Sequence, residues 1–382
     1  MPKIGLLIDT LIGGGAERIT LNLYDAFTEL GHEAHIFLVA NKIEHNLPDI
    51  PADRLHWLSE DGKISRNKVL NKLLLAQRLR KLVHGIESGQ SQPFAFFISS
   101  AEDMDRLTRI AGMANVLIRY RNSMWVYLQN KIKNREGIKR KWRNWQFLRK
   151  FRAIYGGRHI VTVSHALIED IVDKVGVRPK SIRTIYNPFN FSLYRSKAQE
   201  PSDYPDEPYI LYLARFENRK RHDLLVRAFH KANPDCKLVL MGGVYTKSDQ
   251  DELAMIRQLI QELGLEGKVL LPGFRSNPYP WIKHARLFAM SSDSEGLPTV
   301  LIESLILGTP VVSTDCPTGP SEILTGEFSR FLSPIGDADT LADNLREALS
   351  NYPEINEGLI AKYHHLEVAH QYIAHATQLF RR

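Results

Sequence analysis

The 382-residue sequence has only two cysteines, Cys236 and Cys316, and they stand far apart in the chain. Two distant cysteines form neither a disulfide framework nor the usual ligand pattern of a zinc site. This shortage argues against a small disulfide-stabilised secreted domain and is typical of a protein in a reducing compartment. We therefore expect a cytoplasmic protein.

The sequence also lacks a long apolar run. Its N-terminus passes from Met1-Pro-Lys directly into Ile4-Gly-Leu-Leu-Ile8, which is too short and too weakly flanked for a signal peptide. The longer apolar stretches are interrupted by Glu303 or by glycine and proline, well short of the roughly 20 residues that span a bilayer. We expect neither a leader nor a transmembrane helix.

Net positive charge is concentrated in one segment. The chain carries a net charge of +7, but residues 131–158 contain eleven lysines and arginines against one glutamate, so the remainder is slightly acidic. A basic stretch of this kind indicates a local binding surface rather than a generally basic protein.

Short apolar runs alternate with amphipathic helical patterns through both halves of the chain, which favours parallel sheets covered by helices. With 43% hydrophobic and 24% charged residues, a chain of this length suits two globular domains. The expected helices include residues 16–30 and 69–86. The expected strands are residues 4–8, 33–39, 94–99, 116–119, 160–163, 182–185, 209–213, 237–241, 269–271, 287–290, 311–313 and 329–332.

A polar, proline-rich stretch at residues 199–208 reads as a linker between the two halves. The sequence thus predicts a first Rossmann-like domain over 1–198 and a second over 209–355. A helical stretch over 356–382 is expected to pack back on the first domain. Because doubly wound domains bind ligands at the carboxyl ends of their strands, we expect the two domains to face each other across a cleft.

Two glutamates with seven residues between them, Glu295 and Glu303, occupy a strand, glycine turn and helix pattern. We expect the helix to begin at Pro298, a residue that suits a first turn, with Glu295 in the preceding loop and Glu303 about one turn inside. The free N–H groups at the helix start would bind an anion. Two carboxylates on either side of an anion site suit a nucleotide sugar, with hydroxyls at both ends and phosphate between.

Two further loops follow strands. Gly13-Gly-Gly-Ala-Glu-Arg18 either approaches a ligand phosphate or simply makes a tight turn; it departs from the dinucleotide fingerprint because Arg18 replaces the third glycine. Arg215 and Lys220 follow a later strand and could neutralise a diphosphate. The alternative for this pair is a solvated basic loop.

In combination these motifs resemble a known family. The glycine loop, Arg215 with Lys220, the Glu295 to Glu303 segment and Gly319-Pro-Ser-Glu322 occur in the order found in the retaining glycosyltransferases of the GT-B type in family four. The resemblance covers nearly the whole chain. It implies the GT-B fold, a sugar-transfer reaction and no cofactor or metal.

The resemblance also implies roles for individual residues. Glu295 would contact the donor sugar and Glu303 the ribose, with Arg215 and Lys220 on the phosphates. Glu295, Arg215 and Lys220 would be the catalytic residues. Further donor contacts are implied at Gly14, Gly15, Phe274, Arg275, Gly296, Leu297 and Thr299. The chain would cross into the second domain at Asn187-Pro188.

On the acceptor side the sequence departs from the family pattern. Many relatives carry a histidine where this chain has Leu117-Ile-Arg-Tyr-Arg-Asn-Ser123. Arg121 and Asn122 are candidates for acceptor or phosphate contacts, and His165 is a further candidate that also suits a structural role at a helix start. With no general base identified, we expect a front-face transfer in which the departing diphosphate helps to deprotonate the acceptor. Asp103-Met-Asp105 reads as a helix start rather than a metal motif.

The basic segment 131–158 interleaves its cations with apolar residues spaced three or four apart, from Ile138 and Trp142 to Tyr155. Such a helix suits an anionic membrane surface. Packing through the tryptophans is the second reading, and nucleic-acid binding the third.

The function that we expect is transfer of a sugar from a nucleotide donor, UDP-sugar first, to a hydroxyl of a lipid-linked surface glycan such as lipopolysaccharide or capsule. The enzyme would work in the cytoplasm, peripherally on the inner face of the membrane. The alternatives are a nucleotide-sugar epimerase of the same architecture and a non-enzymatic basic adaptor for membrane or nucleic acid.

Overall fold

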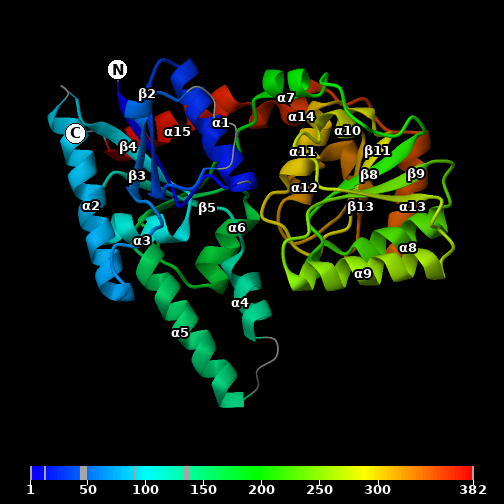
Figure 1. Cartoon of the computed structure of the whole chain (residues 1–382), viewed down its shortest axis with the longest axis horizontal. Coiled ribbons are helices and arrows are strands. Elements are labelled where there is room, and N and C mark those ends of the chain that lie inside the picture. The colour runs from blue at the N-terminus through cyan, green and yellow to red at the C-terminus, as the bar shows by residue number, and fades with distance from the viewer. Residues whose placement is uncertain (1, 13, 44–49, 90–91, 133–136, 381–382) are drawn as a thin grey trace. The chain divides into compact units, whose positions relative to one another are not determined.

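The structure is a computed structural model that describes residues 2–12, 14–43, 50–89, 92–132 and 137–380. Contacts divide the chain into two compact units, Met1–Phe189 with Tyr363–Arg382, and Asn190–Lys362. Blue to green ribbon marks the first unit and green to orange the second in Figure 1, with the C-terminal helix of the first unit in red.

Among its described residues, the first unit holds a seven-stranded parallel sheet in the order β3-β2-β1-β4-β5-β6-β7. Its strands are β1 (Lys3–Ile8), β2 (Glu33–Ala40), β3 (Leu55–Ser59), β4 (Phe94–Ser99), β5 (Val116–Tyr120), β6 (His159–Thr162) and β7 (Ser181–Thr184). Its α-helices are α1 (Gly15–Glu29), α2 (Lys68–Ser88), α3 (Glu102–Ile110), α4 (Met124–Ile132), α5 (Gly137–Tyr155), α6 (Ala166–Glu169) and α15 (His365–Phe380).

The core of this unit follows from its apolar strands. Every residue of β1 is buried, as expected for a central parallel strand covered on both faces. At Gly5 an added Cβ would lie 2.2 Å from the Phe97 ring, so a side chain there would force the buried ring to move. Helix α15 adds Val368 and Tyr372 to the same core and packs on α1, which confirms the expected return of the C-terminal helix to the first domain.

The second unit holds a six-stranded parallel sheet in the part of it that the structure describes, in the order β10-β9-β8-β11-β12-β13. Its strands are β8 (Tyr209–Leu213), β9 (Lys237–Met241), β10 (Val269–Gly273), β11 (Leu287–Met290), β12 (Val311–Thr314) and β13 (Leu332–Ser333). The α-helices are α7 (Phe191–Lys197), α8 (His222–Ala232), α9 (Lys247–Glu262), α10 (Tyr279–His284), α11 (Thr299–Ile306), α12 (Pro320–Ile323), α13 (Ala338–Ser350) and α14 (Glu357–Ile360). Both units are therefore Rossmann-like, as expected.

The boundary between the units differs from the expected one. The contacts change unit after Phe189, close to Asn187-Pro188, and not at 199–208. Helix α7 packs on α10 and α11 of the second unit. The proline-rich stretch lies along the second unit, because Asp203 is ion-paired with Arg275. Its polar composition reflects this exposed course rather than a hinge.

Two expected elements are shorter than predicted. Most of the strand expected at 329–332 is a 3-10 helix, Gly326–Phe331, and only Leu332–Ser333 pairs with β12. The helical stretch expected at the C-terminus is broken by a 3-10 turn at Ala361–Tyr363, which separates α14 from α15. Of the helices described, none has the length and apolar character to cross a membrane.

Candidate functional site

The carboxyl ends of β8 and β11 form the centre of the candidate site. The strand order of the second unit reverses between these two neighbours, and such a reversal leaves a crevice at the carboxyl ends of the strands. The loop after β8 carries Arg215 and Lys220, and the loop after β11 carries Glu295. The sheet topology thus brings together the three residues predicted to be catalytic within one edge of the sheet.

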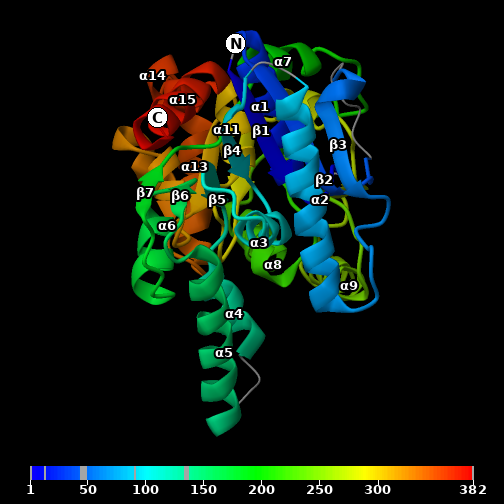
Figure 2. The ribbon, with the colours of Figure 1, turned by 90° about the vertical axis from the view of Figure 1, so that its left-hand side faces the viewer.

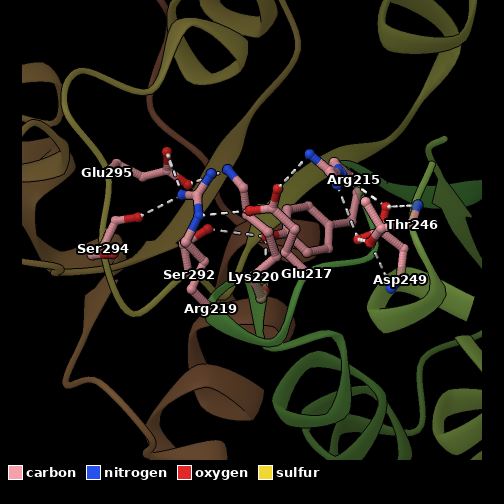
Figure 3. A network of polar contacts seen from close by, with 10 residues as sticks. Arg215, Glu217, Arg219, Lys220, Thr246, Asp249, Ser292, Ser294 and Glu295 are labelled. Atoms are coloured by element: carbon pink, nitrogen blue, oxygen red, sulfur yellow. Dashed lines mark hydrogen bonds and ion pairs between the residues drawn. The ribbon is translucent and has the colours of Figure 1, made fainter. Parts of the chain in front are cut away.

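Lys220 and Glu295 form a largely buried ion pair across these two loops. The Lys220 Nζ to Glu295 Oε1 distance is 2.5 Å, and the side chains are 15% and 11% exposed. Arg219 lies on the other carboxylate oxygen, with Nη1 3.6 Å from Glu295 Oε2, and also donates to the Ser294 carbonyl. Figure 3 shows the two cations converging on the carboxylate. Arg219 was not predicted, although it adjoins Lys220.

The pair fixes the charge of Glu295. Burial raises the pKa of its carboxyl, but the charges of Lys220 and Arg219 and the hydrogen bond from Lys220 outweigh burial. The net result is a pKa below the ordinary 4.5. Glu295 is therefore an anion at neutral pH, able to accept hydrogen bonds from hydroxyl groups.

Buried hydroxyls hold the two loops in register. The Tyr212 hydroxyl donates to the Lys220 carbonyl at 2.8 Å and lies 3.0 Å from the Ser292 hydroxyl. Ser291 donates to the carbonyls of Lys220 and Arg221. Arg221 has a positive φ of 49°, a conformation that non-glycine residues seldom adopt. These contacts therefore hold a strained turn that directs Lys220 towards Glu295.

Arg215 is held separately by a carboxylate that the sequence did not reveal. Its Nε and Nη2 lie 2.9 and 3.1 Å from the two oxygens of Asp249, and its Nη1 lies 3.0 Å from Glu217. Asp249 also caps α9 together with Thr246 (Figure 3). The Arg215 side chain remains 39% exposed, so it can reach a ligand while its orientation stays fixed.

A glycine allows the close approach of the β8 and β9 loops. A Cβ at Gly242 would lie 1.9 Å from the Ala214 carbonyl oxygen, directly before Arg215. Gly242 and Gly243 directly follow β9, and this glycine pair is the sequence signal that could have indicated the contact. Substitution there would move the Arg215 loop.

The start of α11 lies beside the ion pair, one residue later than predicted. Pro298 is the N-cap with an extended ψ of 98°, and the helix begins at Thr299, so Pro298 is not its first helical residue. No side chain caps the N-terminus, which leaves the first amides for a ligand. Leu297 is buried in the loop, and Glu303 is 1% exposed inside the apolar helix.

The loop after β12 supports this turn. Thr318 donates its hydroxyl to the Glu295 carbonyl. Gly319 has a φ of 101°, and a Cβ there would lie 2.4 Å from the Pro298 ring and 3.2 Å from the Gly296 carbonyl. Glycine at this position therefore meets both a backbone and a space requirement, which explains why the Gly319-Pro-Ser-Glu322 motif accompanies the glutamate pair.

The two residues predicted near the base lie after β10 at the same edge of the sheet. Phe274 is 63% exposed. Arg275 makes a two-point ion pair with Asp203, with nitrogen to oxygen distances of 3.1 and 2.6 Å. Arg275 is therefore engaged by the proline-rich stretch, while Phe274 presents a free ring face suited to stacking.

The predicted acceptor residues Arg121 and Asn122 line a pocket of about 250 Å³ in the first unit. The pocket opens at the carboxyl ends of β4 and β5. His165 does not line it: this residue is exposed, precedes α6 and makes an edge contact with the Tyr186 ring. Its position directly before α6 fits the structural reading, and its contact with the acceptor remains a prediction.

The glycine loop also belongs to the first unit. Gly13 lies outside the described residues, whereas Gly14 is the extended N-cap of α1 and Gly15 begins the helix. A Cβ at Gly14 would lie 2.5 Å from the Glu17 carboxylate, and nothing lies within 4 Å of one at Gly15. Their contact with the donor phosphates remains a prediction.

The basic segment folds as α4 and α5, with residues 133–136 outside the described part. Figures 1 and 2 show α5 extending away from the sheet of the first unit. Its C-terminal turns are buried through Phe151 and Tyr155, whereas Trp142 and Trp145 are each 55% exposed. Core packing therefore explains the apolar residues in the C-terminal half of α5 but not the two exposed tryptophans.

Comparisons with known proteins agree with this architecture. The family model for glycosyl transferases group 1 matches residues 195–363, and that for glycosyltransferase family 4 matches residues 13–193. The N-acetylgalactosamine-N,N'-diacetylbacillosaminyl-diphospho-undecaprenol 4-alpha-N-acetylgalactosaminyltransferase of Campylobacter jejuni is 30% identical over 359 residues, which is 92% of this chain and 91% of that protein.

More distant proteins share parts or the fold. A lipopolysaccharide 1,6-galactosyltransferase of Salmonella typhimurium is 24% identical over 212 residues, 54% of this chain and 56% of that protein. The crystal structure of Anabaena HepE in complex with UDP and glucose covers 100% of this chain and 96% of its own, with a TM-score of 0.68 at 18% identity. The chain therefore belongs to the GT-B glycosyltransferases of family four and is a glycosyltransferase.

Proposed function

We propose that this glycosyltransferase is a retaining enzyme that moves a sugar from a UDP-sugar to a hydroxyl of a lipid-linked surface glycan. The observation that supports this most is the buried Lys220–Glu295 pair, with Arg219 on its far side, at the carboxyl ends of β8 and β11. A cation pair and a carboxylate beside an uncapped helix start suit a diphosphate joined to a sugar.

The proposed chemistry begins with an exchange of partners. A donor diphosphate would draw Lys220 and Arg215 onto its oxygens, while Glu295 accepts hydrogen bonds from the sugar hydroxyls. As the bond from the sugar to the phosphate breaks, negative charge grows on the leaving diphosphate, and these cations with the first amides of α11 stabilise it. The leaving phosphate oxygen would then take the proton of the acceptor hydroxyl on the same face of the sugar, which retains the anomeric configuration.

Other residues would complete the donor site. Glu303 is assigned to the ribose, Phe274 and Arg275 to the surroundings of the base, and Gly14 and Gly15 to the phosphates. Gly296, Leu297 and Thr299 would contribute their backbone near the diphosphate. The HepE structure was obtained with UDP and glucose, which favours a uridine donor here.

The acceptor class is inferred from the relatives and the pocket. The Campylobacter relative is named for an alpha transfer to a sugar on diphospho-undecaprenol, and the Salmonella one for lipopolysaccharide. A lipid-linked glycan placed at Arg121 and Asn122 would fit both names.

Contact with the membrane would come from the exposed half of α5. Four cations there, together with Trp142 and Trp145, are exposed: Lys139, Arg140, Lys141 and Arg143. Cations near an anionic surface contribute about 1 kcal/mol each, and tryptophan suits the interface. The enzyme would accordingly work on the inner face of the cytoplasmic membrane.

A thermal-shift screen with UDP-, GDP- and ADP-sugars, followed by product analysis, tests the proposal. We expect stabilisation by a UDP-sugar and transfer that needs an acceptor and persists with EDTA. A new sugar nucleotide formed from donor alone would identify an epimerase instead. No shift with any sugar nucleotide would favour the adaptor.

A further inference from the structure

Helix α2 exposes apolar side chains that the core of the first unit does not use. Its inner face is buried and packs on β3 and α3. On the outside, Val69, Leu70 and Leu73 in its first two turns are 70%, 47% and 51% exposed, and Ile64 in the preceding loop is 39% exposed. Single exposed apolar residues are common, but four of them within residues 64–73 form a patch, and such patches typically mark interaction sites.

Two asparagines fix the geometry of this patch. Asn71 accepts hydrogen bonds from the amides of Ile64 and Ser65 at 2.6 and 3.0 Å. Asn67 is the N-cap of α2 and accepts from two amides of the first turn. The loop is therefore folded against the start of the helix, and Ile64 is held beside the first turn.

The same part of the chain is strongly basic. Residues 63–81 contain seven lysines and arginines and no acidic residue, a local excess that the slightly negative balance outside 131–158 conceals. All but Lys72 are exposed, and within the described parts of the chain none of the seven forms an ion pair. On the adjacent helix α3, Glu102 and Asp103 are already paired with Arg106. The start of α2 thus combines exposed aliphatic side chains with unmatched positive charge.

We propose that this part of the first unit docks on an anionic lipid bilayer, as a membrane contact separate from that of α5. Cations attract the negative headgroups, and aliphatic side chains enter the boundary between headgroups and acyl chains. The name α2 surface is used for the residues that would make the contact: Lys63, Ile64, Arg66, Lys68, Val69, Leu70, Lys72 and Leu73.

The composition of the α2 surface favours a bilayer over two other partners. A second copy of the chain would bring the same cations together across a two-fold axis, and like charges repel. Nucleic acid would be attracted by the charge, but single strands are bound through aromatic side chains that stack on bases. Residues 63–81 contain no aromatic residue.

The position of α2 in the first unit agrees with this partner. Helices α2 and α4 follow β3 and β5 of the same parallel sheet, so both segments leave the sheet at the same edge. Figures 1 and 2 show the N-terminal ends of α2 and α5 both at the lower end of the first unit. One bilayer can therefore meet both. The inference deepens the proposed function at the membrane, and it rests on that proposal only for the role of α5.

Hydrogen exchange read by mass spectrometry, with vesicles of phosphatidylglycerol and phosphatidylcholine, tests the contact. We expect these vesicles to slow exchange in residues 62–70, and vesicles of phosphatidylcholine alone to do so less. In a protein whose four exposed α5 cations are replaced by glutamine, the same protection should persist, because the α2 surface is unchanged. Protection that disappears with the α5 cations would overturn the proposal.

Two sets of substitutions separate the apolar and the charged contributions. The triple variant Val69→Ser, Leu70→Ser and Leu73→Ser should weaken vesicle binding about 10-fold or more, because three side chains no longer leave water. These side chains are exposed, so its urea unfolding should match that of the wild type. The matched control replaces Met255 and Ile335 by serine; both are exposed in the second unit, at 52% and 43%, and binding should be unchanged.

The charge variant is Arg66→Gln with Lys68→Gln. It should weaken binding to anionic vesicles by at most about 25-fold, or about fivefold for each cation. Its matched control is Arg257→Gln with Lys283→Gln, which removes two exposed cations of the second unit and should bind as the wild type. Equal binding of the triple serine variant and the wild type would overturn the proposal.

The rival partners give different results. A dimer in light scattering that the triple serine variant abolishes would assign the patch to a second copy. An oligonucleotide that binds the wild type but not the charge variant, without vesicle protection at residues 62–70, would assign it to nucleic acid. Either result would overturn the choice of a bilayer.

Turnover distinguishes a failure of this inference from a failure of the proposed function. The triple serine variant should match the wild type with a water-soluble acceptor and be slower with an acceptor embedded in anionic vesicles. Equal rates with the embedded acceptor would overturn the contact. Absence of sugar transfer in every preparation would refute the proposed function and leave the vesicle-binding result intact, since no donor residue lies on the α2 surface.

Discussion

The Lys220–Glu295 pair gives the sharpest quantitative prediction. In Lys220→Met the Glu295 carboxylate would stay buried with Arg219 3.6 Å away as its remaining cation. Breaking a buried ion pair from one side costs about 3–5 kcal/mol. Because Arg219 remains and the pair retains 15% and 11% exposure, we expect a loss of about 2–3 kcal/mol in the free energy of unfolding.

The double variant Lys220→Met with Glu295→Gln separates the charge from the packing. It removes both ions, so its total loss should be roughly 1 kcal/mol or less, smaller than that of Lys220→Met alone. Urea unfolding of the wild type, both single variants and the double variant at pH 7 measures this coupling. Additive losses would refute the reasoning, because they would mean that the two groups do not interact.

The pH dependence of the same cycle provides a second reading. The pKa of Glu295 in the folded protein lies below its ordinary 4.5. The ionised carboxylate therefore stabilises the folded state above pH 4.5, and this contribution is lost as the pH falls through the folded pKa. Unfolding at pH 7 and at pH 3 should therefore differ more for the wild type than for Glu295→Gln.

Three further predictions concern turnover, pH and the membrane. Arg215→Ala should lower turnover about 10²-fold, the scale of a lost transition-state cation, with an unchanged circular dichroism spectrum; wild-type turnover would remove Arg215 from the reaction. Burial is the main reason why the pKa of folded Asp105 is raised to about 7, so between about pH 4 and pH 7 this group holds a proton that the unfolded chain releases. The free energy of unfolding should therefore fall over this pH range, and Asp105→Asn should reduce that fall. Thermal unfolding at pH 4 and 8 checks this, and an unchanged difference would contradict it. The last variant replaces the four exposed cations of α5 by glutamine, at Lys139, Arg140, Lys141 and Arg143. It should lose at most roughly 4 kcal/mol of attraction to anionic liposomes and keep its donor binding. Equal co-sedimentation of the wild type with anionic and neutral liposomes would contradict membrane contact.

Much of the fold could be predicted from local patterns. β4, β8, β9 and β11 have the predicted bounds, because strands buried on both faces consist largely of apolar residues. β3 was missed because Leu55-His-Trp-Leu-Ser mixes polar and apolar residues, as an edge strand allows. The boundary at Phe189 could not be read from composition, since α7 and the proline-rich stretch are held to the second unit by long-range contacts.

The site was predictable as a set of motifs but not as a network. Glu295 and Lys220 came from spacing and resemblance, whereas the hold of Asp249 on Arg215 spans 34 residues of sequence and depends on the order of β8 and β9. Arg119 was read only as part of a strand, because its burial and its contacts with Asn187 and Tyr372 exist only in the folded unit.

The anomeric configuration of the product tests the central claim most directly. Proton NMR of the glycan made from an alpha-linked UDP-sugar should show a new alpha linkage, formed with the front-face transfer at the Lys220–Glu295 site. A beta linkage would contradict the retaining mechanism and with it the roles assigned to the leaving diphosphate and its cations.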